Sequence, residues 1–144
     1  MTMPQALTPP PHEDAPADVS LNQPIVCALT TESDAVKAER LARVLVERGL
    51  AGCVSLLPMN SIYSWQGQLE RSAEVQLLIK TTPMRLAALH RAVLDLHSYE
   101  TPMWVYWQAQ ADAGYGAWLG QVTAHPGDPP PVGADSPESG GPTG

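Results

Sequence analysis

The chain has 144 residues, the length of one ordinary domain, and a formal net charge of −7. Its Lys and Arg residues form no basic stretch, so the sequence gives no electrostatic support for a nucleic-acid partner. The sequence also lacks an apolar run of about 18 residues, which a membrane span needs. We expect no secretory signal, because the first residues lack a basic start followed by an apolar stretch.

Charge and proline are concentrated at the two ends of the chain. Six of the 15 prolines lie in residues 1–24 and six in 125–144, whereas all Lys, Arg, Trp and Tyr residues lie in 25–124. Segments rich in proline and acid but without aromatic residues bury too little apolar surface to fold. We therefore expect a single domain over 25–124 between two disordered tails. The tails would serve as solubilising spacers or as docking segments for a protein partner.

The first half of the domain predicts a strand, a helix and a second strand. Residues 25–30 (IVCALT) are short, apolar and β-branched at the start, which is typical of a buried strand. Thr31 is a candidate N-cap for a helix that ends near Gly49. The stretch LAGCVSLLP predicts the next strand, ended by Pro58. The apolar residues of the helix recur at helical spacing: Ala38, Leu41, Ala42 and Leu45.

The second half predicts a hairpin, a helix, a strand and a short final helix. Residues 61–82 alternate as two strands around a Gln66-Gly67 turn. Thr82 and Pro83 are suited to the first turn of the next helix. Residues 101–110 (TPMWVYWQAQ) predict a strand rich in aromatics, with Pro102 near its beginning. Residues 114–124 predict the last helix.

The predicted order β-α-β-β-α-β is the ferredoxin-like split β-α-β pattern of the α+β class, with an antiparallel sheet and both main helices on one face. The second face should be polar if water covers it. Neither set of alternate residues in the strands is polar, so closed self-association is the simplest way to cover that face. Glu74 and Lys80 would then lie in a subunit interface or in a cleft beside it.

Few residues are candidates for chemistry. Cys53 is either a small buried side chain or a soft metal ligand or reactive thiol, and Cys27 is expected in the core. His97, in the loop LHSYETP, is either a ligand or base, or a loop histidine bonded to backbone. Two cysteines make no disulfide framework, so we expect a reducing cytoplasm. The sequence lacks a phosphate loop and a nucleophile elbow, so we expect no enzyme.

Three motifs taken together resemble one known family. ERGLAGCVSLLP, SIYSWQGQLERSAEVQLLIKTT and LHSYETP occur in this order within residues 25–122. They resemble the CutA family of divalent-cation tolerance proteins. The resemblance implies a PII-like homotrimer of ferredoxin-like subunits, with sheets inside and helices outside. It also implies a role in tolerance of or response to metals, copper above all, and possible signalling.

The resemblance also implies site residues at clefts between subunits. The family's cysteine falls on Cys53 and its H-P-Y segment on residues 97–99, which makes Cys53 and His97 the expected metal ligands. Two departures stand out: Ser98 replaces the usual proline, and Met103 replaces a glutamate. The Met103 thioether would suit Cu(I), or it would simply pack. The remaining expected binding residues are Trp65, Glu74, Lys80 and Tyr99.

Three alternatives remain open on sequence alone. One is a PII-like trimer that binds a nucleotide or another small molecule, although the short turn at Gln66-Gly67 leaves no room for a long loop. Another is a scaffold or anchoring protein that uses its tails. The third is an enzyme with Cys53 or Glu74 as the reactive group and Lys80 as electrostatic support.

Overall fold

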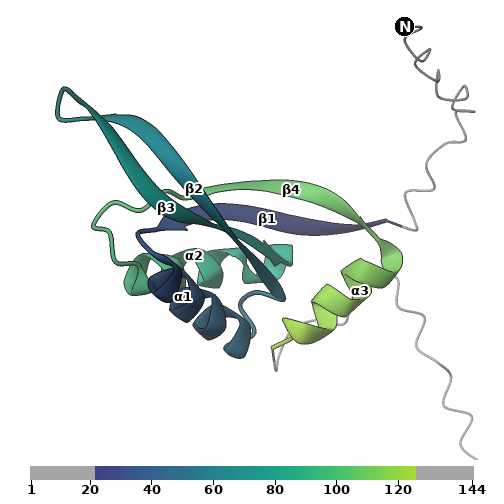
Figure 1. Ribbon diagram of the computed structural model, residues 1–144. Coiled ribbons are helices and arrows are strands. Elements are labelled where there is room, and N and C mark those ends of the chain that lie inside the picture. The colour runs from purple at the N-terminus through teal and green to yellow at the C-terminus, as the bar shows by residue number, and fades with distance from the viewer. Residues whose placement is uncertain (1–21, 126–144) are drawn as a thin grey trace, which may run out of the picture.

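The computed structural model describes residues 22–125, which form one four-stranded antiparallel sheet with helices packed against it (Figure 1). The strand order across the sheet is β2-β3-β1-β4. The predicted α+β class and the β-α-β-β-α-β order are confirmed. The elements are β1 Asn22–Glu32, α1 Ala35–Glu47, β2 Cys53–Trp65, β3 Gln68–Thr81, the 3₁₀ turn η2 Pro83–Arg85, α2 Leu86–Leu96, β4 Val105–Asp112 and α3 Ala113–Val122.

The main core lies between one face of the sheet and the helices α1 and α2. Alternate residues of β3 point into this core, as the period of two along a strand requires. Both helices bury side chains against this one face of the sheet, as the sequence predicted. Burying each large aliphatic side chain stabilises the fold by about 1.5–3 kcal/mol. The main contributors are Ala28, Leu41, Leu45, Leu77, Ile79, Leu89 and Val93.

The start of α1 differs from the prediction. Thr31 does not cap the helix, because β1 continues through it and pairs Thr31 with Gln76 of β3. Asp34 is the N-cap, and its side chain accepts a hydrogen bond of 2.8 Å from the backbone N–H of Lys37. The ladder with β3 therefore moves the start of the helix three residues along the chain.

The prediction that Pro58 ends a strand is wrong. β2 runs without a break from Cys53 to Trp65, and Pro58 lies opposite Val75 of β3. β2 is an edge strand, and a sheet tolerates proline there because an outward backbone N–H has no ladder partner to lose. The strand predicted over residues 50–58 and the first strand of the predicted hairpin are thus one strand, β2.

Other boundaries shift by a few residues. Thr82 stands at the N-cap of η2 but makes no side-chain cap, since its hydroxyl lies 3.3 Å from that of Thr123. β4 begins at Val105, beyond the Pro102 expected near its start. Residues 22–24, assigned to the N-terminal tail, pair with β4 as part of β1. The rest of both predicted tails, apart from His125, lies outside the described residues.

Within residues 22–125, the second face of the sheet is covered only at one end. There α3 buries Leu119 against Ile25 and Ala111. Elsewhere this face leaves Leu57, Val105 and Trp107 between 42% and 56% exposed. The apolar character that the sequence predicted for this face is therefore present on the surface of a single chain.

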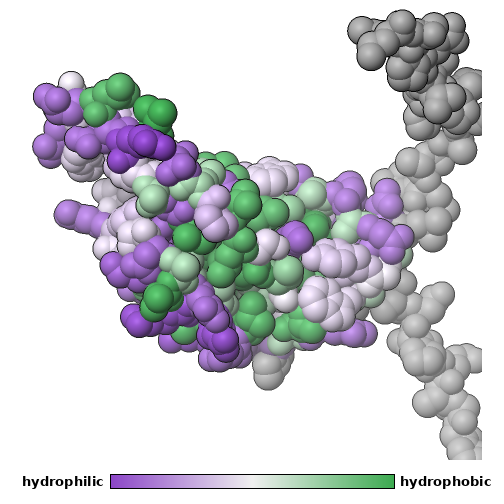
Figure 2. All heavy atoms as spheres, viewed as in Figure 1, coloured by the Kyte–Doolittle hydropathy of each residue, from purple (hydrophilic) through white to green (hydrophobic). Residues whose placement is uncertain are grey.

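The β2–β3 hairpin projects beyond the rest of the sheet as a two-stranded arm, which we define as residues 59–74 (Figure 1). Figure 2 shows hydrophobic atoms on the far part of this arm and again near the middle of the visible face. On the arm, Ile62 is 69% and Leu69 81% exposed. No helix within residues 22–125 is both long and apolar enough to span a membrane.

Candidate functional site

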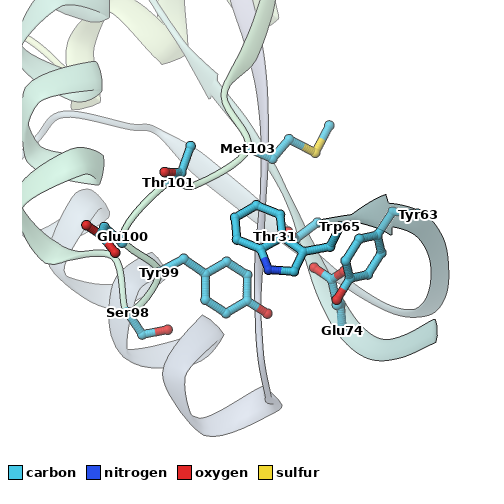
Figure 3. Close-up of a pocket in the computed structure, with 9 residues that line it drawn as sticks. All are labelled: Thr31, Tyr63, Trp65, Glu74, Ser98, Tyr99, Glu100, Thr101 and Met103. Atoms are coloured by element: carbon cyan, nitrogen blue, oxygen red, sulfur yellow. The ribbon is translucent and has the colours of Figure 1, made fainter. Parts of the chain in front are cut away.

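A cavity of about 600 Å³ lies between the arm and the segment that joins α2 to β4 (Figure 3). One wall comes from β2 and β3, and the other from the segment 98–103. The cavity opens on the sheet face that α1 and α2 leave uncovered. Its lining residues are Thr31, Tyr63, Trp65, Glu74, Ser98, Tyr99, Glu100, Thr101 and Met103.

The geometry of the hairpin places the two aromatic residues of the arm on the cavity side. Gln66 and Gly67 have φ angles of 50° and 75°, so the strands join through a tight turn with two left-handed residues. Tyr63 and Trp65, two residues apart on β2, therefore face the same way. The Tyr63 hydroxyl also lies 2.9 Å from that of Ser72 on β3. This short closure leaves no long loop between β2 and β3.

Glu32 holds the opposite wall in place from the end of β1. Its side chain is 2% exposed and accepts hydrogen bonds from the backbone N–H groups of Ser33 at 3.2 Å and Ser98 at 3.1 Å. The hydroxyl of Ser98 donates a further short hydrogen bond to the same carboxylate. Burying a carboxylate costs much less free energy when several groups donate hydrogen bonds to it. Glu32 thus anchors the start of the cavity wall.

Both ring nitrogens of His97 are engaged within the chain. Nδ1 accepts a hydrogen bond of 2.9 Å from the backbone N–H of Tyr99, and Nε2 donates to the carbonyl of Thr31. Its side chain is fully buried, with Nδ1 3.7 Å from Glu32. Of the two alternatives open on sequence, the described chain shows a histidine bonded to backbone. Metal ligation by His97 remains a prediction, and it would require one of these bonds to open.

The field in the cavity is negative. Burial raises the pKa of the Tyr99 hydroxyl, and the nearby carboxylates of Glu74 and Glu32 raise it further. An anionic neighbourhood disfavours a phenolate, so Tyr99 keeps its proton well above neutral pH. The hydroxyl can therefore donate a hydrogen bond into the cavity.

Cys53 and Lys80 lie in a different place. The strand registers pair Lys80 with Cys53 on one side and with Cys27 on the other, and Cys27 also pairs with Trp107. Directly paired residues share a face, so these four form one row on the uncovered face. Burial raises the pKa of the Cys27 thiol, and the Lys80 ammonium partly offsets the rise. The Lys80 Nζ also lies 6.0 Å from the ring centroid of Tyr115 on α3.

Within one chain the predicted site residues therefore form two groups. Met59, which pairs with Glu74, lies six positions beyond Cys53 along β2. At about 3.3 Å per residue this is a distance of about 20 Å. Within residues 22–125, no group of three or more His, Cys, Asp and Glu side chains lies close enough to hold a metal ion.

Of the four expected binding residues, Trp65, Glu74 and Tyr99 lie together in the cavity and Lys80 does not. Their binding role stays a prediction. The sequence did not indicate the role of Glu32. In the sequence, Glu32 has the position of an acidic residue in the first turn of a helix. Its contact with Ser98 joins positions 66 residues apart, and no local pattern encodes that separation.

Comparison with known proteins agrees with this architecture. Residues 26–122 match the family model of the CutA1 divalent ion tolerance protein. The divalent-cation tolerance protein CutA of Citrobacter koseri is 36% identical over 109 residues, which cover 74% of this chain and 94% of that protein. The corresponding protein of Pectobacterium atrosepticum is 42% identical over 96 residues, which cover 65% and 87%.

Among solved structures, CutA from Synechococcus elongatus PCC7942 superposes with a TM-score of 0.69 at 35% identity, covering 74% of this chain and 99% of that one. The family match covers more than half of the chain, and the identity to its members extends over nearly their whole length. The chain therefore belongs to the CutA1 family of divalent ion tolerance proteins.

Proposed function

We propose that the chain acts in tolerance of divalent metal ions as a homotrimer that binds copper, or a related ion, at clefts between its subunits. It binds the metal without catalysing a reaction and works in the cytoplasm. The observation that carries this proposal is the match of residues 26–122 to the divalent ion tolerance family. Within one chain, the Cys53–Lys80 pair lies about 20 Å from the cavity. A cleft between two subunits would bring the thiol of one chain next to the cavity of its neighbour.

The surface of the single chain supports self-association. An isolated two-stranded ribbon is marginally stable in water, yet the arm carries Ile62 and Leu69, both mostly exposed. The uncovered sheet face adds Leu57 and Trp107. Apolar surface on both regions favours a partner that covers them, and a closed ring of identical chains does so without leaving free edges.

The chemistry of the two groups suits a soft or borderline ion. A thiolate from Cys53 is a strong ligand for Cu(I), and the Met103 thioether at the rim of the cavity is a weaker one. Glu74 supplies a carboxylate for the divalent state. His97 could join these ligands only by releasing the Thr31 carbonyl or the Tyr99 amide.

The direct test is a copper titration of the full chain against two thiol variants. We expect Cys53→Ser to weaken copper binding at least tenfold. Cys27→Ser is the matched control, since this thiol lies in the same row but is covered in part by α3. Sedimentation of each variant checks that the assembly is unchanged.

Equal copper binding by the wild type and Cys53→Ser would contradict the proposal. Loss of copper binding in Cys27→Ser but not in Cys53→Ser would identify Cys27 as the ligand, and this result would also contradict the proposal. Cell fractionation of the untagged protein tests the compartment, and recovery outside the cytoplasm would refute that part.

A further inference from the structure

We propose that Lys80 of one chain forms an ion pair with Glu74 of the adjacent chain in the assembly, and that this pair opens when copper binds. The inference rests on the proposed function and deepens it, because it assigns the charge that balances Glu74 when no metal is bound. It starts from the uncovered face of the sheet. Within residues 22–125, the strands present three charged residues on this face, namely Lys80, Glu74 and Glu70.

The Lys80 ammonium has no carboxylate partner in its own chain. Neither of the ion pairs that form within residues 22–125 involves Lys80. Its side chain is half-buried, and Nζ lies 6.0 Å from the ring centroid of Tyr115 on α3. When a second chain covers this face, the ammonium loses much of its remaining water, and a buried charge without a counter-ion is costly. The covering chain must therefore supply a carboxylate.

Glu74 is the carboxylate best placed to do so. It is half-buried on the same face and lies six residues from Lys80 along β3, at a distance of about 20 Å. The two side chains of one chain therefore cannot meet. Glu70 lies four residues farther out on the arm and is exposed. A cation at one end of a strand and a carboxylate at the other suit a head-to-tail contact between copies, and repetition of this contact closes a ring.

This ion pair would lie in the proposed copper cleft. Lys80 pairs directly with Cys53 across β2 and β3, so a neighbour that brings its Lys80 to Glu74 also brings its Cys53 thiol. The ammonium and the metal ion would then compete for the same carboxylate. The ion pair thus favours assembly without metal and lowers the affinity of the cleft for copper.

Charge reversal in the full chain tests the pair by sedimentation equilibrium without metal. We expect Lys80→Glu and Glu74→Lys each to raise the protein concentration needed for half-assembly at least about tenfold, because each places like charges together. The double variant Lys80→Glu with Glu74→Lys restores opposite charges across the contact. It should assemble within about threefold of the wild-type concentration.

Lys80→Glu with Glu70→Lys is the matched control, because it has the same net charge but places the new lysine farther out on the arm. We expect no recovery of assembly in this variant. The inference would be overturned by absence of recovery with Glu74→Lys, or by equal recovery with Glu70→Lys.

Neutral substitutions keep the test decisive if near-ultraviolet circular dichroism shows that a reversed chain does not fold. Lys80→Met and Glu74→Gln each leave one charge of the pair without its partner, whereas the double variant leaves none. The double variant should therefore assemble at least as well as either single variant. Additive losses in this cycle would overturn the inference.

Copper titration tests the opening of the pair. Lys80→Met removes the competing charge and should bind copper at least about threefold more tightly than the wild type. Lys37→Met, at an exposed residue of α1, is the control and should change copper affinity less than about 1.5-fold. Equal effects of the two variants, or weaker binding by Lys80→Met, would refute the opening. A failure of the metal proposal appears separately, as equal copper binding by the wild type and Cys53→Ser.

Discussion

At the scale of single residues, Glu32 has a structural role that its position in the sequence does not indicate. It ends β1 and is almost completely buried, yet it is a carboxylate. The bonds it accepts from Ser33 and Ser98 connect the sheet to the wall of the cavity. The proline that the family resemblance leads us to expect at position 98 would provide neither the N–H nor the hydroxyl. The wall of the cavity is therefore held in place through Ser98.

Replacing Glu32 by Ala should lower the free energy of unfolding by about 2–4 kcal/mol, because buried donors lose a charged acceptor. Ser98→Ala removes a single hydroxyl bond and should cost about 1 kcal/mol. Urea unfolding followed by circular dichroism measures both. Glu39→Ala is the control, since its ion pair with Arg43 joins side chains that are more than half exposed and such surface pairs contribute little to stability. Similar losses for Glu32 and Glu39 would contradict the anchoring role.

At the scale of elements, the hairpin depends on a turn whose first residue is unfavourable. Gln66 takes a positive φ, which side chains other than Asn, Asp and Gly rarely adopt. The turn sets the register between β2 and β3, in which Trp65 pairs with Gln68. The orientation of Trp65 toward the cavity follows from this register, since a slip of one residue would turn it to the other face.

Gln66→Asn should therefore stabilise the protein, by up to about 1 kcal/mol, because Asn tolerates the left-handed region better. Gly67→Ala should destabilise it by about 1 kcal/mol, since its φ of 75° strains any side chain. Thermal unfolding of the two variants should give melting temperatures on opposite sides of the wild type. A shift of both in one direction would mean that the turn geometry does not determine stability.

Two glycines of α3 make a second matched pair. A Cβ on Gly116 would overlap the Cβ of Gln23 on β1, whereas a Cβ on Gly120 would meet nothing within 4 Å. Gly116→Ala should push α3 away from the sheet and cost about 1–3 kcal/mol. Gly120→Ala should stabilise by about 0.5–1 kcal/mol, through a lower entropy cost of forming the helix. Denaturant midpoints decide this, and a stabilising Gly116→Ala would show that the contact is not tight.

The elements also show how far the sequence predicts the fold. The alternation of Val75, Leu77 and Ile79 was sufficient to predict which face of β3 enters the core. The continuity of β2 through Pro58 was not predictable, because it depends on β2 being an edge strand, which only the assembled sheet reveals. Likewise, local spacing could not place Cys53 about 20 Å from Glu74, since that distance follows from strand register.

At the scale of the whole molecule, we expect the uncovered sheet face to determine the oligomeric state. Trp107, 42% exposed, lies in the row with Cys27 and Lys80 on this face. Val36 is 67% exposed but lies on α1, on the opposite side of the sheet. In the proposed homotrimer the first of these residues is covered and the second remains in water.

Sedimentation equilibrium should therefore give a trimer for the wild type and a smaller species for Trp107→Glu, because a charge in an apolar interface is costly. Val36→Glu, which also adds a charge at an exposed apolar residue, should remain trimeric. A stable, folded monomer of the wild type at micromolar concentration would contradict the assembly. Dissociation of both variants alike would show that the effect is not specific to the sheet face.

The distance along β2 between the thiol and the cavity has a consequence for heterozygous cells. A chain with Cys53→Ser still contributes an intact Glu74, and a chain with Glu74→Gln still contributes an intact thiol. In the proposed copper cleft neither variant would form a working site alone, but co-assembly would create one wherever an intact Cys53 meets an intact Glu74. Two recessive alleles would then complement each other in trans, and copper resistance would return in cells that carry both.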